Sequence, residues 1–132
     1  MDNFFLGDEL KAEYFVGQSV YEGFLNTFED TNPMHINAIY AMKYGYNEIV
    51  MHGNILNGFI SHFIGVNLPA KNLVIISQEI KFRNPVYLND WIQIKSRVDD
   101  IHDALSLVSL KLFLTNHRGE KVANAMVEIK IL

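Results

Sequence analysis

An aspartate and a histidine lie five residues apart in the chain, at Asp30 and His35. Pro33 restricts the backbone between them, so both side chains can be held toward one point. A carboxylate and an imidazole that face the same water provide a general acid and a general base. By spacing alone the simpler interpretation is favoured, in which Asp30 caps the turn and His35 makes a local hydrogen bond.

A second group of polar residues begins at His52, directly before the best helical pattern in the chain. The free amides at a helix N-terminus stabilise a developing negative oxygen, and Gly53 would let a substrate approach the backbone closely. The simpler interpretation is a loop that needs a glycine. Ser61 lies farther along the same helix. A serine inside a helix most often donates a hydrogen bond to a backbone carbonyl of the preceding turn, and without a neighbouring base it is not a nucleophile.

The helix that positions these residues is predicted over residues 53–65. Its apolar face comprises Ile55, Leu56, Phe59, Ile60, Phe63 and Ile64. Its second face is small and polar and contains no acid, and it comprises Asn54, Asn57, Gly58 and Ser61. The spacing of both sets is helical. Gly65 is expected in the left-handed conformation that often follows a helix end.

The remaining elements are short helices before residue 70 and strands after it. A strand is predicted over residues 13–16, and the S-x-x-E pattern of Ser19–Glu22 predicts a capping box that starts a helix. Asn37 is predicted to cap another short helix that ends at Gly45. Alternating residues predict strands over 73–83, 91–98, 105–115 and 122–131, with a hairpin turn at 116–119. This order favours an α+β fold in which a curved antiparallel sheet wraps the long helix.

Composition limits the class of protein. The chain has 132 residues, 49% of them hydrophobic, a net charge of −4 and no cysteine. We expect one domain over residues 1–132, without disulfides, cysteine-based metal clusters or a thiol nucleophile. The mild negative charge argues against nucleic-acid binding. Neither a signal peptide nor a membrane span is expected, which favours a cytoplasmic protein.

Four ordered blocks resemble the MaoC-like (R)-specific enoyl-CoA hydratases of the hotdog fold. Residues 30–35 match their D-x-N-P-x-H signature, residues 50–53 their second block, Ser61 the serine of their central helix, and residues 80–90 their F-x-x-P-V-x-x-x-D segment. The resemblance covers roughly residues 14–130. It implies a sheet around a central helix and a homodimer, or a higher oligomer, whose sheets join edge to edge.

The resemblance also implies a reaction. In that family the aspartate and histidine hold a water that adds across a trans-2-enoyl thioester to give an (R)-3-hydroxyacyl thioester, or leaves in the reverse dehydration. Asp30 and His35 take these places here. We expect His35 to be the base and Asp30 to relay the proton to C2, although exchanged roles stay open. The Gly53 amide is the expected oxyanion donor.

Other residues are assigned smaller roles in the same site. Ser61 and Asn57 are expected to orient the pair, and His52 belongs to the predicted substrate-binding block. No cofactor is expected beyond the coenzyme A or acyl carrier that bears the thioester. Basic strand residues such as Arg83 are candidates for contacts with its phosphates, although strands also carry such residues to face solvent.

The chain departs from the family pattern on the polar face of the helix. Asn54 stands where the family commonly has an apolar residue, and Asn57 makes this face more polar than usual. Both would narrow the thioester tunnel that the resemblance implies near the dimer interface, or would add a hydrogen bond to an unusual acyl group, so a simple fatty-acyl substrate is less favoured.

Three alternatives compete with a hydratase. A hotdog thioesterase would need a carboxylate at the central helix, yet residues 53–65 contain none and Glu48 is the nearest acid upstream. A non-catalytic acyl-thioester-binding module would have no need of an Asp–His pair. A metal site formed by Asp30, His35 and His52 lacks an H-x-H or HExxH spacing, and we expect no metal.

Overall fold

The structure is a computed structural model that describes residues 3–132, so the first two residues of the predicted domain lie outside the described part. Its strands are β1 (Glu9–Phe15), β2 (Leu73–Phe82), β3 (Trp91–His102), β4 (Leu107–Asn116) and β5 (Lys121–Ile131). They form one antiparallel sheet of five strands in the order β1-β3-β4-β5-β2. Strands β1 and β2 are therefore the two edges.

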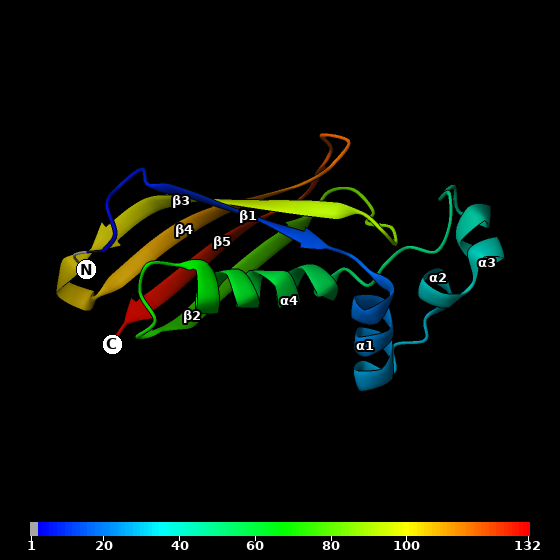
Figure 1. Cartoon of the computed structure of the whole chain (residues 1–132), viewed down its shortest axis with the longest axis horizontal. Coiled ribbons are helices and arrows are strands. Elements are labelled where there is room, and N and C mark those ends of the chain that lie inside the picture. The colour runs from blue at the N-terminus through cyan, green and yellow to red at the C-terminus, as the bar shows by residue number, and fades with distance from the viewer. Residues whose placement is uncertain (1–2) are drawn as a thin grey trace.

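The helices are α1 (Gln18–Phe28), α2 (Pro33–Ile36), α3 (Ala38–Lys43) and α4 (Asn54–His62). The sheet extends along one side of α4, while α1, α2 and α3 gather beyond one end of the sheet (Figure 1). This confirms the predicted α+β class and the sheet around a central helix. None of the helices in residues 3–132 combines the length and the apolarity needed to cross a membrane.

The core lies between the apolar face of α4 and the inner face of the sheet. Ile55, Leu56 and Ile60 of α4 are buried. The alternating residues of β4 and β5 close the core from the other side, and they include Leu110, Leu112, Leu114, Ala125, Val127 and Ile129. Burial of these side chains fixes α4, and with it the residues at its N-terminus, against a rigid sheet.

The end of the long helix differs from the prediction. Instead of continuing to residue 65, α4 ends at His62 and passes into a π-helical turn, Phe63–Asn67. Gly65 lies inside this turn and does not have a positive φ angle, so the expected left-handed position was wrong. The wider turn buries both Phe63 and Ile64, which is packing that a local glycine signal does not show.

The start of α1 also differs. The helix begins at Gln18, one residue before the expected cap, so Ser19 lies in the first turn and makes no capping bond. Glu22 instead accepts a hydrogen bond from the Gln18 side chain at 2.8 Å. Strand β1 begins at Glu9 rather than at residue 13, because β3 pairs with it along seven residues.

Two local predictions are confirmed. The Asn37 side chain accepts a hydrogen bond from the Tyr40 amide at 3.1 Å and caps α3. Gly119 has a φ of 80° in the tight turn between β4 and β5, a conformation that suits glycine. Both signals depend on neighbours within four residues, which explains why the sequence reveals them.

Candidate active site

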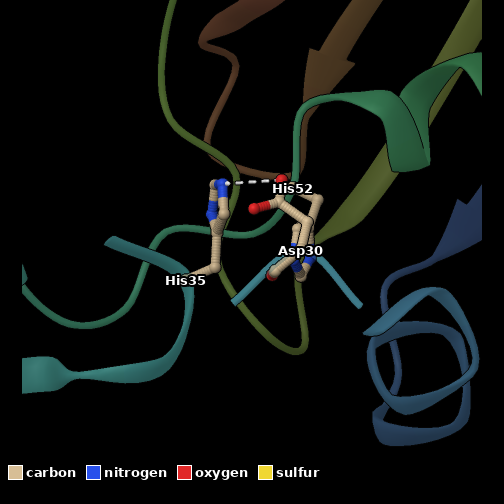
Figure 2. Close-up of side chains that lie close together, drawn as sticks. All are labelled: Asp30, His35 and His52. Atoms are coloured by element: carbon tan, nitrogen blue, oxygen red, sulfur yellow. Dashed lines mark hydrogen bonds and ion pairs between the residues drawn. The ribbon is translucent and has the colours of Figure 1, made fainter. Parts of the chain in front are cut away.

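Three side chains from separate segments meet beside the N-terminus of α4 (Figure 2). Asp30 follows α1, His35 lies in α2, and His52 precedes α4. The His35 Nε2 atom lies 3.8 Å from Asp30 Oδ2, and the close-up shows the imidazole facing that carboxylate. The two residues that the sequence proposes for acid–base chemistry are thus brought together.

Local hydrogen bonds hold the backbone around His35. Asn32 caps α2 by accepting from the Met34 amide at 3.0 Å. The Tyr21 hydroxyl donates to the His35 carbonyl at 2.6 Å. Burial, and then the nearby Glu22 carboxylate, raises the pKa of Tyr21 above its usual value, which keeps the hydroxyl protonated as a donor. Helix α2 is only four residues long and is held in place by these contacts.

The imidazole of His35 is oriented by a backbone carbonyl. Its Nδ1 atom lies 2.8 Å from the Val50 oxygen. Because a carbonyl only accepts hydrogen bonds, Nδ1 carries the proton and Nε2 of the neutral ring has the free lone pair. The basic nitrogen therefore points toward Asp30, as a general base requires.

The two carboxylate oxygens of Asp30 have different surroundings. Its Oδ1 atom accepts a hydrogen bond from the Asn32 amide at 3.2 Å, as the capping interpretation expects. Its Oδ2 atom faces His35 at 3.8 Å, too far for a direct hydrogen bond but suited to a bridging water. The side chain is 49% exposed and that of His35 is 18% exposed, so a reactant can reach both.

His52 lies behind this pair rather than on a cavity wall. It is only 2% exposed, and its Nε2 atom donates to the Asp30 carbonyl at 2.9 Å. Its ring centre lies 4.1 Å from that of His35 and 4.7 Å from that of Phe24. Its Nδ1 atom is buried and has no hydrogen-bond partner among the described residues. His52 thus contacts both members of the pair from the protein interior.

The backbone amide of Gly53 belongs to the wall of a cavity that His35 also lines. Within residues 3–132, no acceptor is bonded to this amide. A Cβ atom at this position would lie 3.1 Å from the Phe82 ring, so a side chain here requires Phe82 to move. The amide stands at the N-terminus of α4, where the helix dipole favours negative charge.

Two cavities flank the Asp30–His35 pair. The larger, of about 780 Å³, lies between α1 and α4 and has Asp30 on its wall. The smaller, of about 300 Å³, is lined by His35, Gly53, Phe82 and Arg83 among others. The pair therefore stands where the two spaces approach each other, and an elongated molecule that passed from one to the other would cross it.

Of the other predicted site residues on α4, one lines a cavity and one does not. Asn57 lines the larger cavity. Ser61 is exposed on α4 and lines neither cavity. The roles of Gly53, Asn57, Ser61 and His52 stay predictions. Sequence reasoning missed the Val50 carbonyl that orients His35, because a backbone acceptor fifteen residues away leaves no signal in residue type.

The same three side chains are the set that could hold a metal ion. Asp30, His35 and His52 each offer one ligand atom, and these atoms lie within 4.8 Å of one another. Two nitrogens and one oxygen would suit a borderline divalent cation such as Zn²⁺. The sequence-based expectation of a metal-free site stays a prediction.

Comparisons with known proteins bear on the family and the fold of the chain. Residues 6–110 match the sequence model of the family described as MaoC like domain. A 3-hydroxybutyryl-CoA dehydratase from Methylorubrum extorquens is 32% identical over 96 residues, which are 73% of this chain and 60% of that protein. An (R)-specific enoyl-CoA hydratase from Rhodospirillum rubrum is 36% identical over 63 residues, 48% of this chain and 44% of that protein.

The chain thus spans between about two-fifths and three-fifths of the length of these two curated relatives. Among solved structures, the (R)-hydratase from A. caviae superimposes with a TM-score of 0.90 at 20% identity, and all of both chains is covered. At that identity the likeness shows the fold, which is the hotdog arrangement of a sheet around a central helix.

Proposed function

We propose that this chain, which belongs to the MaoC-like domain family, catalyses the reversible hydration of trans-2-enoyl thioesters to (R)-3-hydroxyacyl thioesters. The observation that carries the proposal is the oriented Nε2 lone pair of His35, which lies 3.8 Å from Asp30 Oδ2, so that one water at their side can hydrogen-bond to both atoms. Gly53 lines the same cavity as His35. The names of the two curated relatives support the same reaction class.

In the proposed mechanism a water held between His35 and Asp30 attacks C3 of the enoyl group. His35 Nε2 takes one proton from the water, the new C3–O bond forms, and the electrons of the C2–C3 double bond move toward the thioester oxygen. The Gly53 amide donates a hydrogen bond to that oxygen. His35 then passes this proton to the Asp30 carboxylate, which delivers it to C2 on the same face as the thioester carbonyl re-forms. Both side chains return to their starting states, so no other reactant is consumed.

The two cavities suggest how the thioester lies. The larger cavity is lined mainly by apolar residues of α1 and α4 and suits the acyl chain. The smaller cavity leads from Gly53 to Arg83 and suits the start of the carrier arm, whether coenzyme A or acyl carrier protein. The thioester carbonyl would then lie at the Gly53 amide.

The edge of the sheet supports a homodimer. Strand β2 pairs with β5 on one side only, and it exposes the apolar residues Val74, Ile75 and Ile76. A long apolar edge strand is ready to pair with a second chain. We propose that two copies join their sheets along β2. Light scattering after size exclusion should give twice the monomer mass, and Ile76→Lys should shift it toward the monomer.

A direct assay tests the proposed reaction. Purified protein mixed with crotonyl-CoA should reduce the absorbance of the enoyl group, and chiral chromatography should identify (R)-3-hydroxybutyryl-CoA. Asp30→Asn and His35→Ala should each reduce kcat by about 10²–10⁴-fold. Release of free thiol without hydration would contradict the proposal and favour the thioesterase alternative.

The same assay tests whether Asp30, His35 and His52 hold a metal ion. Activity retained after dialysis against a chelator supports the metal-free mechanism. Activity that is lost on chelation and restored by a divalent cation would assign Asp30, His35 and His52 to a metal centre instead.

A further inference from the structure

Three amide side chains form a continuous hydrogen-bonded row that leads from the edge of the sheet to the wall of the larger cavity, which its last two members line. Asn54 and Asn57 lie three residues apart on α4, and Gln78 lies on β2. Gln78 Nε2 donates to Asn57 Oδ1 at 2.6 Å, and Asn57 Nδ2 donates to Asn54 Oδ1 at 2.8 Å. We call these three residues the amide row. Each bond runs in the same direction, from the edge strand toward the N-terminus of α4.

The amide row ends in a free donor. Asn54 Oδ1 is occupied by Asn57, while Asn54 Nδ2 meets no acceptor in the part of the chain that the structure describes. Consecutive hydrogen bonds polarise one another, which strengthens the last donor of the row. Asn54 follows Gly53 directly and lines the larger cavity together with Asp30. The free amide is therefore presented close to the proposed reaction centre.

The rest of the cavity wall limits what this donor can bind. The wall is mainly apolar, with residues such as Val20, Phe24 and Ile55, and among residues 3–132 Asp30 is the only charged side chain on it. A carboxylate on the ligand would meet the negative charge of Asp30 without a compensating cation. An uncharged oxygen, such as a ketone, can accept from Asn54 without this repulsion.

We propose that Asn54, anchored by Asn57 and Gln78, selects enoyl thioesters whose acyl chain carries an uncharged acceptor oxygen. The inference rests on the proposed function and names its substrate class. A plain alkyl chain would cover the amide without giving it an acceptor, and a polar group left unpaired in this way is unfavourable. Because Asn54 is exposed to solvent, we expect a preference of about tenfold rather than the much larger values of fully closed sites.

Matched substrates provide the first measurement. The value of kcat/KM is determined for trans-2-octenoyl-CoA and for its analogues with a ketone at C5, C6 or C7. At least one ketone should exceed the alkyl substrate by about tenfold, and the preferred position would report the reach of Asn54. Saturated octanoyl-CoA and its oxo analogues are compared by calorimetry, so that the preference is also measured as a dissociation constant without turnover.

Variants of the amide row identify the donor. Asn54→Asp keeps an acceptor for Asn57 but removes the free amide, so the ketone preference should disappear. Asn57→Leu and Gln78→Leu remove the anchor and should reduce the preference by smaller factors. Asn26→Leu is the matched control, because Asn26 is exposed on α1 and makes no side-chain hydrogen bond in residues 3–132. It should keep the preference of the unmodified chain.

The outcomes separate this inference from the proposed function. Hydration of crotonyl-CoA without any ketone preference in rate or binding would overturn the inference and leave the function intact. A ketone preference in binding without any hydration would overturn the function and retain the selective cavity. If Asn54→Asp keeps the preference, or changes the oligomeric mass, the amide row is a structural or interface feature and the inference is wrong.

Discussion

Two aspartates of this chain each face a basic side chain, and they are held in opposite ways. Asp90 accepts two hydrogen bonds from Arg118, one from Nη1 to Oδ1 at 3.0 Å and one from Nη2 to Oδ2 at 3.2 Å. The Asp90 side chain is 4% exposed. The Tyr87 amide also donates to Oδ2 at 3.0 Å. Asp30 instead faces His35 at 3.8 Å and is half exposed. Both oxygens of Asp90 therefore accept hydrogen bonds from the protein, whereas one oxygen of Asp30 stays available to a reactant.

This difference separates a structural ion pair from a candidate catalytic pair. Hydrogen-bonded partners on both oxygens of a buried carboxylate offset its loss of hydration. Such a pair locks the β4–β5 hairpin against the segment before β3. At the other site the open geometry contributes little to stability, and the lone pair of His35 is kept for chemistry. The two pairs should therefore respond oppositely to mutation.

The largest effect is expected from a double-mutant cycle at Asp30 and His35. If both residues act on one water, Asp30→Asn combined with His35→Ala should lower kcat no further than His35→Ala alone, about 10²–10⁴-fold. The unfolding free energy of Asp30→Asn should stay within about 1 kcal/mol of that of the unmodified chain, because Asp30 is half exposed and makes no direct bond to His35. Crotonyl-CoA hydration and urea unfolding measure the two quantities. Fully additive losses of activity would show that the residues act separately.

The second prediction concerns the buried ion pair of Asp90 and Arg118, which we call the closed pair. Arg118→Met leaves the buried Asp90 carboxylate without its main partner and should lower the unfolding free energy by about 2 kcal/mol. The activity of the folded fraction should be kept. Arg97→Met is the matched control, because Arg97 meets Asp99 at 3.7 Å on the exposed face and should cost below about 0.5 kcal/mol. Equal losses in the two variants would contradict the comparison.

The third prediction concerns His52, which contacts the open pair, Asp30 and His35, from the protein interior. His52→Phe keeps an aromatic ring beside His35 but removes the donor to the Asp30 carbonyl. Because a small displacement of Asp30 misplaces the water, kcat should fall by about tenfold while KM changes little. Steady-state kinetics with crotonyl-CoA checks this split. An increase in KM alone would instead place His52 in substrate binding, as the sequence pattern predicted.

The same two regions show what a sequence can and cannot predict. The Asp30–His35 pair and the turn at Gly119 are encoded within a few residues, by a proline-restricted segment and by a glycine with a positive φ angle. The partners that give each pair its character come from elsewhere in the chain. Val50 orients His35 through its backbone, and Arg118 reaches Asp90 across 28 residues. Such contacts arise only when the helices and the sheet pack together.

Helix ends illustrate the same limit. The pattern of α4 is strong because it repeats over several turns, yet its last turn becomes π-helical to bury Phe63 and Ile64. Tertiary packing there determines the backbone more than the glycine at position 65. The capping box at Ser19 fails for a related reason, since β1 and Gly17 place the helix start one residue earlier.

The smallest effect should appear at Glu120, on the rim of the closed pair. Hydrogen bonds from Asn116 and then from Arg118 hold the pKa of Glu120 below its usual value. A carboxyl whose pKa is lowered by folding stabilises the native state above its unfolded pKa, and this contribution is lost as the pH falls through its native pKa. NMR titration should therefore find Glu120 ionised to lower pH than in an unfolded chain. In Arg118→Met its pKa should rise only part of the way, because the Asn116 amide still donates to Oε1. A full return to the usual value would assign the effect to Arg118 alone.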